Sequence, residues 1–138
     1  MDELYLKGEL LMTKEEFAEK LVKICPNKKS ALSQHYDDYG ELLGHIFFTD
    51  EISIPLIELL KQDSDKENIQ FLCDFIEDMW ASGTMDVINI VDVSILESLS
   101  DEKKIWHSFG KYISDEFKNY INNDVLCNNI AMFCVSKL

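Results

Sequence analysis

The chain has 138 residues, of which 46% are hydrophobic, and a net charge of −13. This length and apolar content predict a single folded domain over residues 1–138 and exclude an intrinsically disordered chain. The scarcity of glycine (5) and proline (2) favours helices over a turn-rich β fold. No apolar run approaches the roughly 18 residues that span a bilayer, and the charged start has no signal-peptide pattern, so we expect a cytoplasmic protein.

The first segments of the chain have clear start and stop signals. Residues 1–12 show no periodicity and are expected to form an N-terminal arm or a first half-helix. Thr13 and Glu16 match a capping box, which starts a helix, and Pro26 is expected to end this helix near Cys25. The sequence therefore predicts a first helix over about residues 14–25.

The next segment has apolar and aromatic residues at every third or fourth position, which predicts a helix. We expect Ser30 to cap this helix and Gly40 or Gly44 to break or kink it, because glycine weakens a helix interior. A further helix is predicted over residues 51–62, capped by Thr49 or Asp50.

A second capping-box pattern begins at Ser64 and ends at Glu67, which predicts the start of another helix. The segment that follows has a regular apolar stripe with the spacing of a helix. Its members are Ile69, Leu72, Cys73, Ile76, Met79 and Trp80. Gly83 is expected to end this helix.

Residues 87–96 are rich in β-branched side chains and could form a strand. We favour a buried central helix, because threonine and serine caps flank a mostly apolar segment. The expected buried face consists of Met85, Ile88, Val91, Ile95 and Leu99.

The C-terminal third predicts two more helices. Ser100 and the acidic residues after it resemble a helix start, and an aromatic stripe runs from Ile105 to Ile121. A break is expected at residues 122–124, followed by a last helix over residues 125–137. The whole pattern predicts an all-α domain of about six to eight helices, either an irregular bundle or a short stack of helical hairpins.

No catalytic signature occurs in the sequence, so we expect no enzymatic activity and no cofactor. Glu41 and His45 are four residues apart, with His35 nearby, and such groups can bind iron, manganese or zinc. A di-iron bundle repeats Glu-x-x-His on two helices, whereas Glu-x-x-x-His occurs once here. A metal-binding bundle or enzyme that uses these three residues is therefore kept only as an alternative.

The negative charge is concentrated in the middle of the chain. Residues 35–102 contain seventeen Asp and Glu against two Lys, a net charge of −15, whereas residues 1–34 are neutral and residues 103–138 carry +2. Such a segment would attract a cationic protein and repel nucleic acid. An acidic surface can also serve solubility alone.

We expect the acidic and tyrosine residues of this segment to form the binding surface, because tyrosines are enriched at interface hot spots and carboxylates complement lysine and arginine. The candidate residues are Tyr36, Asp37, Asp38, Tyr39, Glu41, His45, Asp50, Glu51, Asp74, Glu77, Asp78 and Asp86.

The run HYDDYGELLGHIFF, which begins at His35, resembles a group of small, helical, uncharacterised bacterial proteins. Similar chains carry an E-x-L-x-H segment like residues 41–45, a helix like residues 71–80 and a segment like residues 87–99 that ends in L-E-x-L. The matching positions are Tyr39, Glu41, His45, Glu77 and Glu97. This resemblance covers about residues 33–105 and implies a likeness to immunity partners of bacterial toxins.

The leading hypothesis is an immunity or antitoxin protein that neutralises a basic toxin domain, such as a nuclease, through its acidic surface. A helical adaptor in a larger assembly is the second alternative, beside the metal-binding bundle. The sequence does not indicate the oligomeric state.

Overall fold

The computed structural model describes residues 10–125, which form a single all-α domain, as the sequence predicts. The α-helices are α1 (Lys14–Ile24), α2 (Lys29–Tyr39), α3 (Gly44–Phe48), α4 (Ile54–Gln62), α5 (Lys66–Ser82), α6 (Met85–Ile90), α7 (Glu97–Leu99), α8 (Lys103–Gly110) and α9 (Asp115–Tyr120). A short 3-10 helix, η2 (Pro26–Lys28), joins α1 to α2. Among the helices described, none is long and apolar enough to cross a membrane.

Three of the helices continue directly into π-helical turns. The turn η3 (Thr49–Ser53) joins α3 to α4, η4 (Val91–Leu96) joins α6 to α7, and η5 (Ile121–Val125) extends α9. When α3–η3–α4 and α6–η4–α7 are each counted once, residues 10–125 form seven helical rods. This count agrees with the predicted range.

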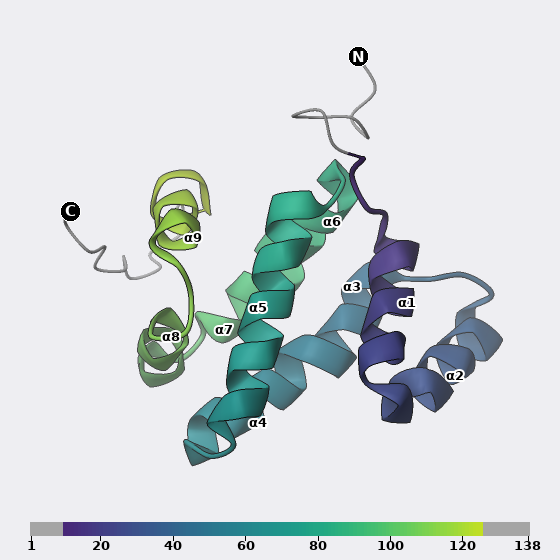
Figure 1. The fold of residues 1–138 in the computed structure, drawn as a ribbon, viewed down its shortest axis with the longest axis horizontal. Coiled ribbons are helices and arrows are strands. Elements are labelled where there is room, and N and C mark those ends of the chain that lie inside the picture. Colours follow the sequence, from purple (N-terminus) through teal and green to yellow (C-terminus); the bar gives the residue numbers. More distant parts are fainter. Residues whose placement is uncertain (1–9, 126–138) are drawn as a thin grey trace.

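The long helix α5 lies in the middle of the domain, with α1 and α2 on one side and α8 and α9 on the other (Figure 1). Five of the six residues of its predicted stripe are buried, namely Ile69, Leu72, Cys73, Ile76 and Met79, and the sixth, Trp80, is half-buried. Aromatic contacts join α5 to both sides. Phe75 packs edge-on against Phe17 of α1 at 6.0 Å between ring centroids, and Trp80 packs against Phe117 of α9 at 4.9 Å.

The segment before α1 also attaches to α5. The Met12 amide donates to the Ser82 carbonyl at 2.8 Å, and the Thr84 amide donates to the Met12 carbonyl at 3.0 Å. These two bonds form an isolated parallel bridge between Met12 and Gly83. The predicted arm falls mostly on residues 1–9, which lie outside the described part of the chain.

The capping box at Thr13 is confirmed. The Glu16 amide donates to Thr13 Oγ1 at 3.2 Å, and the Thr13 amide donates to Glu16 Oε1 at 3.0 Å. The helix ends at Ile24, two residues before Pro26, as proline requires.

Three other predicted helix starts are misplaced by one to three residues. Helix α2 begins before Ser30 and has no side-chain cap, whereas α5 is capped by Asp65, whose carboxylate accepts from the Asn68 amide at 3.3 Å. The Ser100 hydroxyl donates backwards to the Glu97 carbonyl at 2.8 Å and does not cap α8. Small polar side chains near a helix boundary can hydrogen-bond to free backbone groups at either helix terminus, so their position in the sequence does not by itself identify the cap.

The predicted break falls at Gly40, which ends α2 in the left-handed conformation (φ 74°). A new helix start at Thr49 or Asp50 is wrong, because α3 continues into the π turn η3. This wider turn directly precedes Pro55, which lacks an amide hydrogen and would clash with the carbonyl four residues earlier in a regular α-helix. The π turn therefore lets one rod pass through a proline.

Residues 85–99 are helical, so the favoured prediction is confirmed over the strand. The predicted buried face is partly wrong, because Met85 is 58% exposed while Val87, Ile90 and Leu96 are buried. The wider π turn η4 rotates only the residues from Val91 onward, so it accounts for the burial of Leu96 but not for the exposure of Met85, the first residue of α6. The predicted break at residues 122–124 is also wrong, since η5 runs through them, and the predicted helix 125–137 lies almost wholly outside the described residues.

Candidate partner-binding surface

Helix α2 and the bend after it carry five of the predicted binding residues, and all five are exposed. They are Tyr36, Asp37, Asp38, Tyr39 and Glu41. Only Leu32 and His35 of α2 are buried, so most of the helix faces solvent. The two tyrosines remain 37% and 46% exposed, so parts of both aromatic rings are accessible to a partner.

Helix α1 adds two carboxylates to this surface that the sequence interpretation missed. Partial burial, and then the negative charges of Glu15 and Glu19, raise the pKa of Tyr36 above its ordinary value. Both glutamates are exposed and four residues apart, a spacing that places them on one helical face. The sequence interpretation missed them because residues 1–34 are neutral as a segment and because lysines of α1 lie close to these glutamates on the helix.

We call Glu15, Glu19, Asp37, Asp38 and Glu41, together with the two tyrosines of α2, the acidic face. Asp38 accepts a hydrogen bond from Gln34 Nε2 at 2.9 Å. Among residues 10–125, none of these five carboxylates forms an ion pair. The face therefore carries carboxylates without ion-pair partners beside exposed aromatic rings, and Lys20 and Lys23 of α1 lie at its border.

His35 attaches α2, and with it this face, to the rest of the domain. Its Nε2 accepts from the Leu43 amide at 2.9 Å, which ties α2 to the N-terminus of α3. The imidazole packs against Tyr39 at 4.7 Å and against Phe47 at 5.6 Å between ring centroids. His35 thus has a structural role, and it holds one of the exposed tyrosines in place.

The alternative metal site has no support in this geometry. Glu41 lies in a bend outside any helix, so it is not paired with His45 on a helical face. His35 is buried and bonded to the backbone, while His45 contacts Ser94 of η4. The described part of the chain contains no group of three or more His, Cys, Asp or Glu side chains that could hold a metal ion.

Three of the candidate carboxylates already have partners within the fold. Glu51 pairs with Lys28 at 3.1 Å, and both side chains are about four-fifths buried. Asp78 of α5 pairs with Lys20 of α1. Glu77 contacts α9, as described next, so these three residues hold elements together and are not counted in the acidic face.

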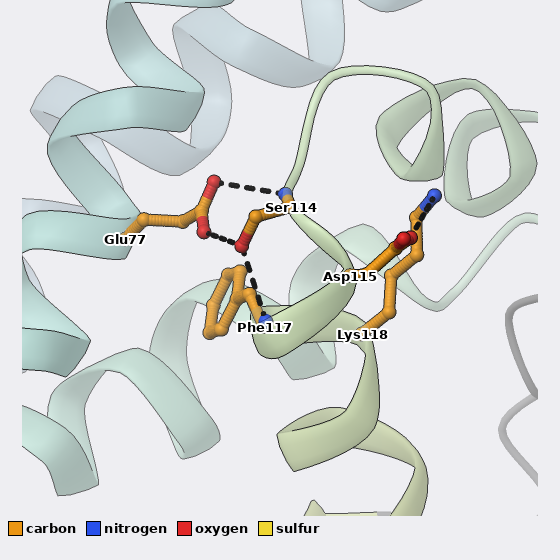
Figure 2. Close-up of polar contacts among 5 residues, drawn as sticks. All are labelled: Glu77, Ser114, Asp115, Phe117 and Lys118. Carbon is orange, nitrogen blue, oxygen red and sulfur yellow. Dashed lines mark hydrogen bonds and ion pairs between the residues drawn. The ribbon is translucent and has the colours of Figure 1, made fainter. Parts of the chain in front are cut away.

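Glu77 joins α5 to the start of α9 (Figure 2). Its Oε2 accepts from the Ser114 amide at 3.1 Å, and its Oε1 accepts from the Ser114 hydroxyl. The same hydroxyl oxygen accepts from the Phe117 amide at 3.2 Å, which caps α9. One carboxylate therefore orients the residue that starts the next helix.

The remaining candidates lie on separate elements. Asp50 on η3, Asp74 on α5 and Asp86 on α6 are exposed, and Asp74 accepts from Gln70 Nε2 at 2.9 Å. Within residues 10–125, no hydrogen bond or ion pair links them to the acidic face. The predicted set is thus divided between one compact group on α2 and isolated carboxylates elsewhere.

The rod α3–η3–α4 and the rod α6–η4–α7 contact each other through polar side chains. Ser94 Oγ lies 2.6 Å from His45 Nδ1, and the Ser53 hydroxyl donates to the Ser94 carbonyl at 3.2 Å. Asn89 Nδ2 lies 3.5 Å from His45 Nε2. Sequence reasoning placed His45 in the binding surface, and the structure places it, although exposed, in this contact between the rods.

A family of domains of unknown function (DUF7674) matches residues 18–127. Neither a curated protein nor a solved structure matches the chain. The matched residues include every helix from α2 to α9 and most of α1. The chain belongs to this uncharacterised family of domains.

Proposed function

We propose that this domain is a binding protein of the immunity or antitoxin type, which neutralises a basic toxin domain by docking its acidic face on a cationic surface. The observation that carries the proposal is the group of five carboxylates of the acidic face, which form no ion pair among residues 10–125, beside the exposed Tyr36 and Tyr39. If the toxin is a nuclease, the carboxylates of the acidic face can occupy the positions that the phosphates of its nucleic-acid substrate would take. The tyrosines add apolar contact area with a polar end.

The contacts that hold the face in place support this proposal. The acidic residues of α2 are placed by His35, which anchors both the Leu43 amide and the Tyr39 ring. A preorganised surface loses less conformational entropy on binding, so more of the interaction energy appears as affinity. The charge pattern adds long-range attraction, which raises the association rate.

The test is the affinity for the product of the neighbouring gene, measured by calorimetry at several salt concentrations. Between about 0.01 M and 0.15 M salt the Debye length falls from about 30 Å to 8 Å, so electrostatic docking should weaken clearly. The triple variant D37N/D38N/E41Q should weaken binding and flatten the salt dependence. The triple variant E58Q/E67Q/D101N removes equal charge from exposed positions outside the face and serves as the matched control.

Equal losses in both triple variants would show that only net charge matters and would contradict a defined face. Salt-independent binding would contradict the electrostatic mechanism. Salt-dependent binding to the face by a neighbouring gene product that is not toxic would favour the adaptor function instead.

A further inference from the structure

The domain also has a hollow whose charge is opposite to that of the rest of the molecule. It lies between the end of α4 and the start of α8 and is lined by Lys61, Lys103, Lys104 and His107. Glu102 is the acidic residue at its edge. Three lysines thus face one glutamate in a protein of net charge −13.

We infer that this hollow binds a small anion with several charged oxygens, of the phosphate or pyrophosphate class. Lysine ammonium groups and an imidazole supply hydrogen-bond donors around the hollow, and the Ser108 hydroxyl adds a neutral one. Leu60 and Ile105 form an apolar part of the wall, and both are buried.

Within the described part of the chain, two of the three lysines of the hollow have no carboxylate partner, as is also true of Lys23 and Lys29 outside it, but only in the hollow do such lysines line one concave site with a third lysine. Lys20, Lys28 and Lys118 are each paired with a carboxylate. In residues 10–125, Lys103 and Lys104 form no ion pair, and both are exposed. Their charge is available to a ligand.

Glu102 neutralises this charge only in part. Its Oε1 lies 3.9 Å from Lys61 Nζ, and the two side chains are 61% and 47% exposed. An exposed pair at this distance contributes little and exchanges readily with a competing anion. The negative field of the whole protein opposes anions over long distances, so short-range contacts in the hollow must provide the affinity.

The test uses pyrophosphate added to the full chain, with amide chemical shifts recorded by NMR. We expect saturable shifts confined to residues 60–61 and 102–108. The variant K103Q/K104Q should weaken binding about tenfold or more, because it removes charge-assisted contacts. The control K23Q/K29Q, which changes two exposed lysines of α1 and α2, should bind like the unmodified chain.

The variant E102Q provides a test that does not depend on a loss of binding. Removal of the competing carboxylate should tighten pyrophosphate binding. Shifts that are absent, that fail to saturate or that spread over the lysines of α1 and α2 would overturn the inference. An unchanged affinity in E102Q together with equal losses in both lysine variants would overturn it as well.

Discussion

At the residue scale, His35 joins two elements through one ring nitrogen. Its Nε2 is the acceptor for the Leu43 amide, and its ring is buried against Phe47. The substitution His35→Leu replaces the imidazole with an apolar side chain of comparable size and leaves the Leu43 amide without its acceptor. We expect a loss of about 1–3 kcal/mol in the free energy of unfolding, measured with urea.

The exposed neighbour Ser33 provides the control, since Ser33→Ala on the same helix should change stability by less than about 0.5 kcal/mol. Equal stability of His35→Leu and the unmodified chain would show that the histidine does not hold α3 to α2.

Cys73 predicts a specific loss of stability at alkaline pH. Burial, and then the charges of Asp74 and Glu77, raise the pKa of its thiol well above the ordinary value. In the unfolded chain the thiol ionises near pH 8.5, whereas in the folded chain it stays protonated. The unfolded state therefore binds fewer protons above this pH, and folding stability falls as pH rises, by up to about 1.4 kcal/mol per pH unit.

The measurement is the urea stability between about pH 8 and 9.5 for the chain and for Cys73→Val, because tyrosines ionise only near pH 10. The other three cysteines are present in both proteins and cancel in the comparison. The variant should show a shallower decline, and parallel declines would refute the assignment to Cys73.

At the scale of elements, two glycines end helices for different physical reasons. Gly40 has φ 74° and nothing near the position of an added Cβ, so it supplies only a left-handed conformation. Gly83 has an ordinary φ, but an added Cβ would overlap the Met79 carbonyl and the Val87 side chain.

We therefore expect Gly40→Asn to be tolerated better than Gly40→Ala, because asparagine adopts the left-handed region more readily. At Gly83 both substitutions should destabilise the domain by about 1–3 kcal/mol or more, because neither residue avoids the overlap. Thermal unfolding of the four variants checks this pattern. A gain from asparagine at position 83 would contradict the steric explanation.

The contact between Glu77 and Ser114 predicts energetic coupling between α5 and α9. The substitution Ser114→Ala removes a helix cap and should cost about 1 kcal/mol, and Glu77→Ala should cost a similar amount. The double variant should cost less than the sum, because both substitutions remove the same contact. A cycle with Glu58→Ala in place of Glu77→Ala should be additive, and additivity in both cycles would exclude the coupling.

The sequence predicts rods better than it predicts their boundaries. The stripe of α5 and the helical nature of residues 85–99 follow from periodicity and length alone. The π turns η3 and η4 do not, because a single wider turn leaves the local composition unchanged while it rotates all later side chains. The exposure of Met85 has a different origin, because this residue is the first of α6 and precedes η4.

The sequence predicts the candidate surface only in part, because tertiary packing decides which residues of different helices become neighbours. The exposed group from Tyr36 to Glu41 is continuous in sequence and could be read directly. Glu15 and Glu19 reach Tyr36 only through the packing of α1 beside α2, and Glu51 and Asp78 are paired by tertiary contacts with lysines far away in sequence. Periodicity on one helix contains no information about such neighbours.

At the scale of the whole molecule, the charge distribution opposes folding. With 26 acidic residues against 13 lysines, unpaired carboxylates repel one another over distances comparable to the domain. Added salt screens this repulsion, whereas it weakens exposed pairs such as Lys61 with Glu102 only slightly. We therefore expect the thermal midpoint to rise by a few degrees as NaCl increases from about 0.01 M to 0.15 M, before any general salt effect on hydrophobic burial.

The acidic face should account for much of this salt response. The variant D37N/D38N/E41Q should be more stable than the unmodified chain at low salt, and its midpoint should change less with salt. In E58Q/E67Q/D101N the same number of charges is removed from more dispersed positions, so the salt response should lie between the two. This order would show that the clustered charge of the acidic face lowers the stability of the domain. Solubility alone does not require such a cluster, because dispersed charge keeps a protein equally soluble. Identical salt responses in the two variants would instead make net charge the sole determinant and remove the energetic argument for a dedicated face.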